Sequence, residues 1–260
     1  MSAAAVEPVD PPGRDAAGPD YSVPALDKAF DVLELLASRS DALSQTEIAD
    51  AVGRSVGQIF RVLTTLEARG WLLRDRASGL YSVSMGAFDL AHRHPPLRGL
   101  LVAATPPMRE LSDRVRQSCN LSVLDMGAVR VVAQVESPAD FGYRVRVGSL
   151  FPLDSASGTV LVAGGEPDVR AQLSGALDPR DVTRIAVDGS LRREDPQQSG
   201  ILDLVLPVRD ARGFARAALV VPYIATSYSS VSADEVFAAA SEAAQTISER
   251  IRGSSQDSAR

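Results

Sequence analysis

Residues 44–74 read SQTEIADAVGRSVGQIFRVLTTLEARGWLLR, and their pattern predicts how the N-terminal part of the chain folds. Ser44 and Glu47 form a Ser-x-x-Glu capping box, which predicts a helix start, and Gly53 predicts the end of that helix. Ser55 predicts the N-cap of a second helix. The second helix carries one apolar stripe, made by Ile59, Val62, Leu63 and Leu66. Two short helices that meet at a tight Gly-Arg turn are typical of a helix-turn-helix.

The flanking segments extend this motif to a winged helix-turn-helix over residues 23–84. Apolar residues at helical spacing predict a first helix over residues 25–39. The runs Trp71–Arg74 and Leu80–Ser84 are strand-like, and Asp75–Gly79 between them predicts a hairpin turn. This hairpin is the predicted wing.

Positive charge is concentrated in the same part of an acidic chain. The whole sequence has a formal net charge of −6, whereas residues 53–77 hold five arginines and two acidic residues, a net charge of +3. A helix-turn-helix pattern alone also occurs in the antiparallel helix pairs of many α proteins. The wing and the local positive charge together favour binding to double-stranded operator DNA.

The second helix supplies the predicted base contacts. Gln58 and Arg61 face outward, where glutamine can pair bidentately with adenine and arginine with guanine in the major groove. The remaining predicted DNA contacts, mainly to phosphates, come from two helix N-termini and the wing. They are Ser44, Gln45, Thr46, Arg54, Ser55, Gly57, Arg74 and Arg76.

Residues 85–96 are predicted to link two domains. Met85–His94 returns to helical spacing, and Pro95–Pro96 is expected to stop that helix. The second domain then opens with an apolar stretch over residues 97–104. We expect a break at Pro106–Pro107 before an amphipathic helix over residues 108–118.

The second domain, residues 97–253, is predicted to be α+β. Its predicted strands are Leu121–Met126, Val129–Glu136, Tyr143–Val147, and the hairpin of Ile201–Val208 with Phe214–Pro222. Its predicted helices are Ser155–Val162, Asp168–Leu177, Asp181–Ile185 and Ala233–Arg252. Residues 1–22 and 254–260 are expected to be disordered tails.

Several runs resemble IclR-type bacterial transcriptional regulators. The segments ALDKAFDVLELLA (25–37), LSQTEIADAVGRSVGQIFRVLTTLEARGWL (43–72) and YSVSMGAFDLA (81–91) resemble the DNA-binding half of that family. The run ESPADFGYRVRVGSLFPLDSASGTVLVAG (136–164) resembles the start of its effector-binding half. The resemblance implies a GAF-like α+β domain that binds a small molecule, often a carboxylic acid, and assembly as dimers or dimers of dimers.

Two carboxylates depart from the family pattern. Asp154 stands where the family usually has histidine or another neutral residue, and Asp203 lies in a strand that many members precede with a cysteine. We interpret Asp154 or Asp203 as favouring a non-anionic effector, such as a polyol or an amine. Asp203 is unusual because an unpaired buried carboxylate is costly, although alternate strand residues also face solvent.

The residues after Asp154 have two interpretations. Ser155, Ala156, Ser157 and Gly158 place small side chains at a helix N-terminus, where free backbone N–H groups suit an anion or a hydroxyl group. Alternatively, Asp154 is the N-cap and the small residues are close-packed filler.

Catalytic groups are scarce, so we do not expect an enzyme, a cofactor or a metal site. Lys28 is the only lysine and lies in the predicted first helix, which excludes a Walker A lysine and a Ser-x-x-Lys pair. His92 and His94 do not share a helix face, and Cys119 reads as a buried structural thiol. A single cysteine and the lack of a signal peptide or of ~20 consecutive apolar residues indicate a cytoplasmic protein without membrane contact.

We therefore predict a sequence-specific DNA-binding repressor whose C-terminal domain senses a small-molecule metabolite. A homodimer would present two recognition helices to half-sites about one helical turn apart, or a multiple of it. The alternative is that the C-terminal domain only oligomerises and binds no ligand.

Overall fold

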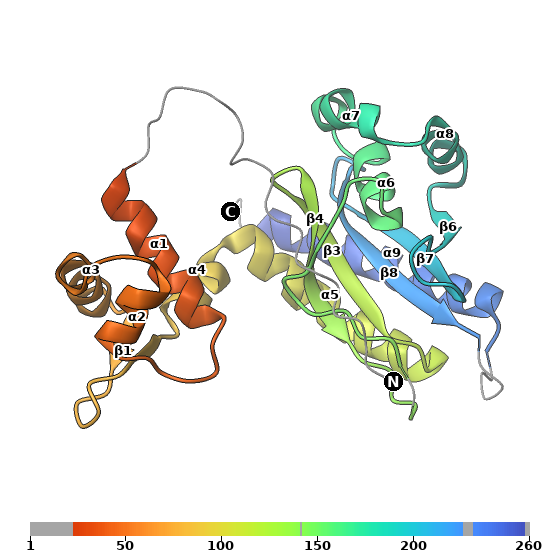
Figure 1. Ribbon diagram of the computed structural model, residues 1–260. Helices are drawn as coiled ribbons and strands as arrows, with labels where there is room; N and C mark the ends of the chain where they lie inside the picture. Colours follow the sequence, from red (N-terminus) through yellow and green to blue (C-terminus); the bar gives the residue numbers. More distant parts are fainter. Residues whose placement is uncertain (1–22, 141, 226–230, 258–260) are drawn as a thin grey trace. The chain divides into compact units, whose positions relative to one another are not determined.

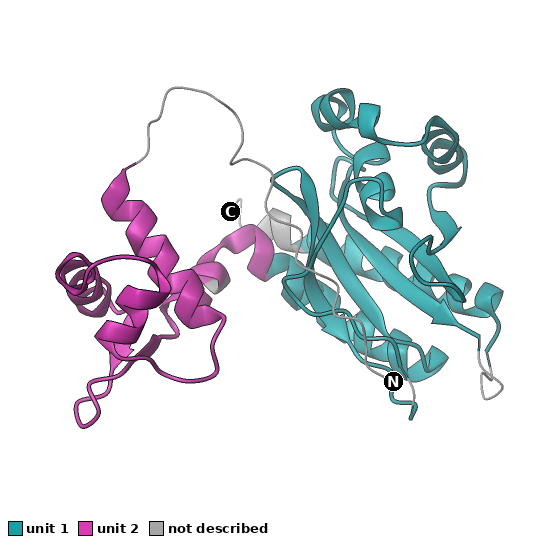
Figure 2. Cartoon of the chain, in the orientation of Figure 1, with its two compact units in different colours: residues 1–14, 99–260 teal, residues 15–98 magenta. Residues whose placement is uncertain are grey.

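The computed structural model describes residues 23–140, 142–225 and 231–257, so the predicted tail over residues 1–22 lies outside the described residues. The chain divides near residue 98 into two compact units, coloured separately in Figure 2. None of the helices in the described part of the chain is long and apolar enough to cross a membrane.

The N-terminal unit is the predicted winged helix-turn-helix. Its helices are α1 (Pro24–Ala37), α2 (Gln45–Ala51) and α3 (Val56–Ala68), and its antiparallel strands are β1 (Leu72–Arg74) and β2 (Tyr81–Val83). The core is formed by fully buried side chains from each helix and from the wing, namely Val32, Ile48, Ile59, Leu63, Leu72 and Tyr81. A bridge between Leu43 and Tyr81 ties the segment before α2 to the wing.

The linker helix ends before Pro95 as predicted, but a second helix that was not predicted begins there. Helix α4 (Gly86–Arg93) ends at Arg93, and α5 (Pro95–Val115) begins at Pro95. Proline is well suited to the first turn, where its missing N–H has no intrahelical partner to lose. Pro106 and Pro107 lie inside α5, and the predicted break there is wrong.

Burial explains why α5 continues past its internal prolines. Each such proline loses a backbone hydrogen bond and costs about 3 kcal/mol or more. Against this, α5 buries a row of apolar side chains in the largest core cluster, including Leu100, Ala104, Met108, Leu111 and Val115. Tertiary packing therefore outweighs the local preference of the two prolines.

In the C-terminal unit, the described residues form one antiparallel six-stranded sheet in the order β5-β4-β3-β8-β7-β6 (Figure 1). The strands are β3 (Cys119–Asp125), β4 (Ala128–Val135), β5 (Leu150–Phe151), β6 (Leu191–Glu194), β7 (Ile201–Arg209) and β8 (Ala215–Ile224). The predicted hairpin of β7 and β8 is confirmed. The predicted strand over Tyr143–Val147 is wrong, because those residues lie in a loop before β5, and β6 was not predicted.

Helices cover both faces of this sheet, which gives the predicted α+β fold. Helix α5 packs on one face together with α9 (Ala233–Asp257). The opposite face carries α6 (Ala156–Ala163) and α8 (Pro179–Asp188), with α7 (Pro167–Leu173) beside them. Helix α9 extends past the predicted end at Arg252, so residues 254–257 are helical rather than part of a disordered tail, and residues 258–260 lie outside the described residues.

Candidate DNA-binding interface and effector site

Helix α3 presents a mostly polar face to solvent. Its apolar stripe of Ile59, Leu63 and Leu66 is buried in the core of the N-terminal unit. At about 100° per residue, Gly57 and Arg61 therefore lie opposite the buried stripe. Both are exposed, as is Gln58 beside them. The structure thus brings the predicted base-reading residues onto one accessible helix face.

Gln58 is also part of the cap of α3. The backbone N–H of Gln58 donates to Ser55 Oγ (3.4 Å), and the backbone N–H of Ser55 donates to Gln58 Oε1 (3.3 Å). This reciprocal capping box satisfies two N–H groups at the helix start. The N-cap at Ser55 is confirmed, whereas the return bond from Gln58 was not predicted, although glutamine at the third helical position can complete a capping box.

Helix α2 begins with the predicted capping box. The backbone N–H of Ser44 donates to Glu47 Oε2 (2.8 Å), and hydrogen bonds from Ser44 hold the pKa of Glu47 below its ordinary value. Gln45, a predicted DNA contact, donates from Nε2 to the Val56 carbonyl at the start of α3 (3.1 Å). Gln45 therefore fixes the two helices of the motif to each other, while Thr46 is exposed.

The wing turns around Asp75. Its Oδ1 accepts hydrogen bonds from the Ser78 and Ala77 backbone N–H groups, and these contacts lower the pKa of the carboxyl group. Arg74 lies with its guanidinium carbon 5.3 Å from the centre of the Tyr81 ring, and Arg76 is exposed on the turn. Both arginines remain accessible for the predicted phosphate contacts.

In the C-terminal unit, Ser155 rather than Asp154 caps α6. Ser155 Oγ accepts a hydrogen bond from the Gly158 backbone N–H (3.2 Å), so the interpretation of Asp154 as the N-cap is wrong. The side chain of Asp154 is exposed, whereas Ala156, Ser157 and Gly158 are buried. A Cβ atom added at Gly158 would clash with the Leu153 carbonyl, which shows that close packing requires this glycine.

Asp203 lies on the sheet face that α6 and α8 cover, the same face as Val205. Burial, and then the nearby Asp195 carboxylate, raise the pKa of Asp203 to about 6, while the Arg193 guanidinium opposes the shift. Asp203 is therefore half-buried, and no ion pair among the described residues includes it. Partial burial of a carboxylate without a close partner is costly.

Arg193 connects Asp203 with the region of Asp154. It stands directly opposite Asp203 in the β6–β7 register. Its Nη1 lies 3.1 Å from Asp181 Oδ2, and its Nη2 donates to the Asp154 carbonyl (2.7 Å). Arg193 Nε is buried and has no hydrogen-bond partner within the described residues. The two candidate segments therefore meet through an arginine that is already paired with a carboxylate.

Tyr143 and Gln198 complete this polar cluster. Gln198 Nε2 donates to the Tyr143 hydroxyl (2.5 Å), and Asp195 accepts from the Gln198 backbone N–H (3.2 Å). Burial raises the pKa of Tyr143, and the carboxylates of Asp195 and Asp203 act in the same direction. Arg193, Tyr143 and Gln198 were not predicted as site residues, since no local pattern links residues that far apart in the sequence.

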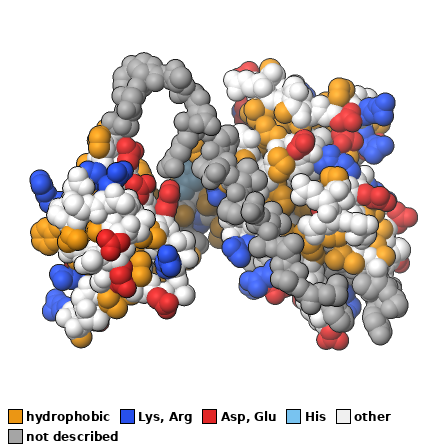
Figure 3. All heavy atoms as spheres, in the orientation of Figure 1, with side chains coloured by type: hydrophobic (Ala, Val, Ile, Leu, Met, Phe, Trp, Pro, Cys, Tyr) orange, Lys and Arg blue, Asp and Glu red, His pale blue; other side chains and the backbone are white. Residues whose placement is uncertain are grey.

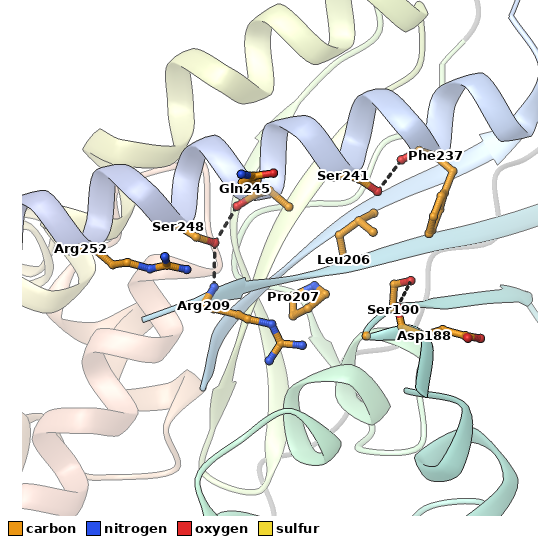
Figure 4. A pocket seen from close by; sticks show the side chains of 12 residues that line it. Asp188, Ser190, Leu206, Pro207, Arg209, Phe237, Ser241, Gln245, Ser248 and Arg252 are labelled. Atoms are coloured by element: carbon orange, nitrogen blue, oxygen red, sulfur yellow. Dashed lines mark hydrogen bonds between the residues drawn. The ribbon is translucent and has the colours of Figure 1, made fainter. Parts of the chain in front are cut away.

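A groove between α9 and the end of β7 lies apart from this cluster (Figure 4). Its volume is about 320 Å³, and Arg209 in its wall already bonds within the protein: the Arg209 backbone N–H donates to Ser248 Oγ, and Arg209 Nη1 donates to the Gly213 carbonyl (both 2.9 Å). The lining residues are Asp188, Gly189, Ser190, Leu206, Pro207, Arg209, Phe237, Ser241, Ala244, Gln245, Ser248 and Arg252. None of the predicted effector residues is among them.

Comparisons with known proteins match each unit to a domain of the same protein family. Residues 25–76 match the family model described as the IclR helix-turn-helix domain, and residues 97–249 match that of the bacterial transcriptional regulator IclR C-terminal. The chain is 26% identical over 246 residues to the HTH-type transcriptional regulator KdgR of Escherichia coli strain K12, which covers 88% of this chain and 93% of that protein.

Solved structures, including one of an IclR homolog, have the same fold as this chain. The crystal structure of Pseudomonas aeruginosa HmgR is 26% identical and superposes with a TM-score of 0.70, covering 88% of this chain and all of that one (100%). An IclR homolog from Microbacterium hydrocarbonoxydans, solved in complex with 4-hydroxybenzoate, superposes with a TM-score of 0.72 at 21% identity, covering 88% and 99% of the two chains.

Proposed function

Because the chain belongs to the IclR family of bacterial transcriptional regulators, we propose that it represses transcription from a specific operator and that a small molecule bound by its C-terminal unit alters this DNA binding. The family and the helix-turn-helix make it a DNA-binding transcriptional regulator, not an enzyme. Repression is the simpler mode, since a protein seated on an operator excludes other proteins without a further contact surface. We place this activity in the cytoplasm, where bacterial operator DNA lies.

The proposed DNA interface consists of the exposed face of α3, the start of α2 and the wing. Arg61 and Gln58 would reach base edges in the major groove, which is about 12 Å wide. Arg54, Arg74 and Arg76 would contact phosphates, because all three are exposed around that face. Figure 3 shows basic side chains (Lys or Arg) beside hydrophobic ones on the visible face of the N-terminal unit.

We propose a homodimer as the DNA-binding form. Helix α1 exposes Leu26 (55%) and Phe30 (59%), and α4 exposes Leu90 (60%). Large apolar side chains exposed on a small unit are available to a protein interface. A second copy that covers them would place two recognition helices on one operator with two half-sites.

The sensing proposal rests on the polar cluster around Asp203, on the sheet face that α6 and α8 cover. Asp203 and Asp195 place two carboxylates together, and the neighbouring Arg193 is paired with Asp181. This charge balance disfavours an anion and favours a cationic or hydroxylated molecule that donates hydrogen bonds to Asp203. The Microbacterium protein holds 4-hydroxybenzoate, so a small aromatic carboxylate is the natural comparison ligand.

A thermal-shift panel on the full chain tests this sensing proposal. The panel contains polyols, primary amines and aromatic carboxylates at equal concentration, and each compound is run against wild type and Asp203→Asn. We expect polyols or amines to raise the melting temperature of wild type and not of the variant. Stabilisation by carboxylates alone would overturn the proposed ligand class.

The operator affinity of the protein, measured with each stabilising compound, then distinguishes a ligand-sensing C-terminal unit from one that only oligomerises. A compound that raises the melting temperature and changes operator affinity supports a sensor. If every binding compound leaves operator affinity unchanged, the C-terminal unit serves only to oligomerise. Selection of duplexes from a random library by the full chain provides the operator, and a failure to enrich any sequence would contradict specific DNA binding itself.

A further inference from the structure

Helix α3 exposes an apolar pair beside its polar face. Phe60 is 52% exposed and Val56 is 42% exposed, although both belong to a helix whose other large apolar side chains are buried or partly buried. The two are four residues apart, so they lie on the same side of the helix, one turn above the other. Phe60 precedes Arg61 and lies about 100° around the helix from it, on the side away from Gln58. The aromatic ring therefore flanks the predicted base-reading residues Gln58 and Arg61.

The surroundings of this pair indicate an anionic partner. No acidic residue occurs between Val56 and Leu66, while Arg54 and Arg61 flank the pair in sequence. A second copy of the chain on the same surface would bring these arginines against their own counterparts, which is unfavourable. A partner that contacts Val56 and Phe60 should therefore have a negatively charged surface that also carries small apolar groups.

DNA meets both requirements in the major groove. The C5-methyl group of thymine is the apolar group that base edges present there, and apolar side chains such as phenylalanine contact it. Phosphates on either side supply the negative charge. We propose that Phe60, supported by Val56, contacts thymine methyl groups in the operator next to the base that Arg61 reaches. This inference rests on the proposed operator binding and names a specificity residue within it.

Local contacts hold the pair in place for this role. Gln45 of α2 donates to the Val56 carbonyl (3.1 Å), and Thr64 Oγ1 donates to the Phe60 carbonyl (2.9 Å). The backbone that carries both side chains is therefore tied to the neighbouring helix and to the next turn. A rigid, already exposed apolar pair needs no rearrangement of the helix to meet the groove.

Replacement of thymine by deoxyuridine tests the contact, since this change removes only the methyl group. The probe is a duplex enriched from a random library by the full-length wild-type chain, with each thymine replaced in turn. We expect one or two replacements to weaken wild-type binding roughly fourfold, the equivalent of about 0.8 kcal/mol for one buried methyl group. Phe60→Ala should bind the thymine duplex more weakly and lose this sensitivity at the same positions.

A control variant and a check of folding accompany the deoxyuridine measurement. Val187→Ala removes an 80% exposed side chain from the other unit and should respond to deoxyuridine as wild type does. Circular dichroism and sedimentation confirm that Phe60→Ala folds and keeps its oligomeric state. Equal sensitivity in wild type and Phe60→Ala, or loss of self-association in Phe60→Ala, would overturn the inference. Failure of the wild type to enrich any duplex would instead contradict the proposed operator binding.

Discussion

The side-chain oxygen of Gln58 accepts a hydrogen bond from the backbone N–H of Ser55, with an N···O distance of 3.3 Å, and so closes the capping box of α3. The same oxygen is required for a bidentate contact with adenine, in which glutamine accepts from N6 and donates to N7. Capping and base reading therefore compete for Gln58 Oε1. Engagement of adenine would release one N–H at the start of the recognition helix, where a phosphate can accept it.

Substitution of Gln58 by glutamate separates these two roles. Glutamate can still accept from the Ser55 N–H and suits a helix N-terminus, so Gln58→Glu should unfold within about 0.5 kcal/mol of wild type. It lacks the amide donor and adds a negative charge near phosphates, so operator affinity should fall at least roughly tenfold. Urea unfolding and fluorescence anisotropy measure the two effects. Wild-type affinity in this variant would show that Gln58 does not contact DNA.

Gly57 tests how closely the backbone of α3 approaches DNA. A Cβ atom added there meets nothing within 4 Å, so Gly57→Ala should be neutral or stabilising by up to about 1 kcal/mol. If the first turn of α3 lies against the groove, operator affinity should nevertheless fall. Gly99→Ala is the matched control, because Gly99 is also helical with open space around it. Equal operator affinities for wild type and both variants would place Gly57 outside the interface.

Arg61→Ala tests base readout by the exposed centre of α3. Loss of a bidentate contact to guanine should cost roughly 1 to 3 kcal/mol and relax specificity at one base pair. Binding is measured against single-base operator variants at fixed salt. Arg69→Ala, at the exposed C-cap of the same helix, should give a smaller effect that is equal for all variants. Uniform weakening by Arg61→Ala would identify a phosphate contact instead.

Asp203 should make stability depend on pH in a defined window. Its pKa rises from 3.8 to about 6 on folding, so the folded state binds the proton more tightly than the unfolded state. The folded state is therefore favoured while Asp203 is protonated, and it loses stability as pH rises from about 4 through 6, by at most about 3 kcal/mol. Asp203→Asn should be more stable than wild type at pH 8, with the difference vanishing near pH 4.

Urea unfolding of both proteins across this range checks the prediction for Asp203. Asp154→Asn, the same substitution at an exposed position, provides the control. A difference between wild type and Asp203→Asn that stays constant from pH 4 to 8 would show that the carboxylate is not destabilised by burial.

Arg193 should contribute strongly to the stability of the C-terminal unit. Its ion pair with Asp181 is largely shielded, with side-chain exposures of 25% and 16%, and it also binds the Asp154 carbonyl. Arg193→Ala leaves a poorly solvated carboxylate and should cost roughly 2 to 4 kcal/mol in urea unfolding. Adding Asp181→Asn should recover part of this loss. Arg184→Ala, an exposed change in α8, should stay within about 0.5 kcal/mol of wild type.

The local features of the fold were predictable from neighbouring residues. The capping box at Ser44, the N-cap at Ser55, the wing and the β7–β8 hairpin each depend on contacts between residues close in sequence. The failures lie where distant contacts compete with local preference. Pro106 and Pro107 remain helical because α5 buries its apolar row, and β6 forms because it pairs with β7 rather than from any strong pattern of its own.

The sequence by itself therefore determined the winged helix-turn-helix, its exposed Arg61 and the class of protein, because hydrophobic period, caps and turn residues act over a few positions. Only the tertiary structure decided that Asp203 is half-buried beside Asp195 and Arg193. It also decided that Phe60 is exposed rather than packed. Burial and charge balance at these positions depend on side chains brought together from different elements, and no spacing along the chain encodes that proximity.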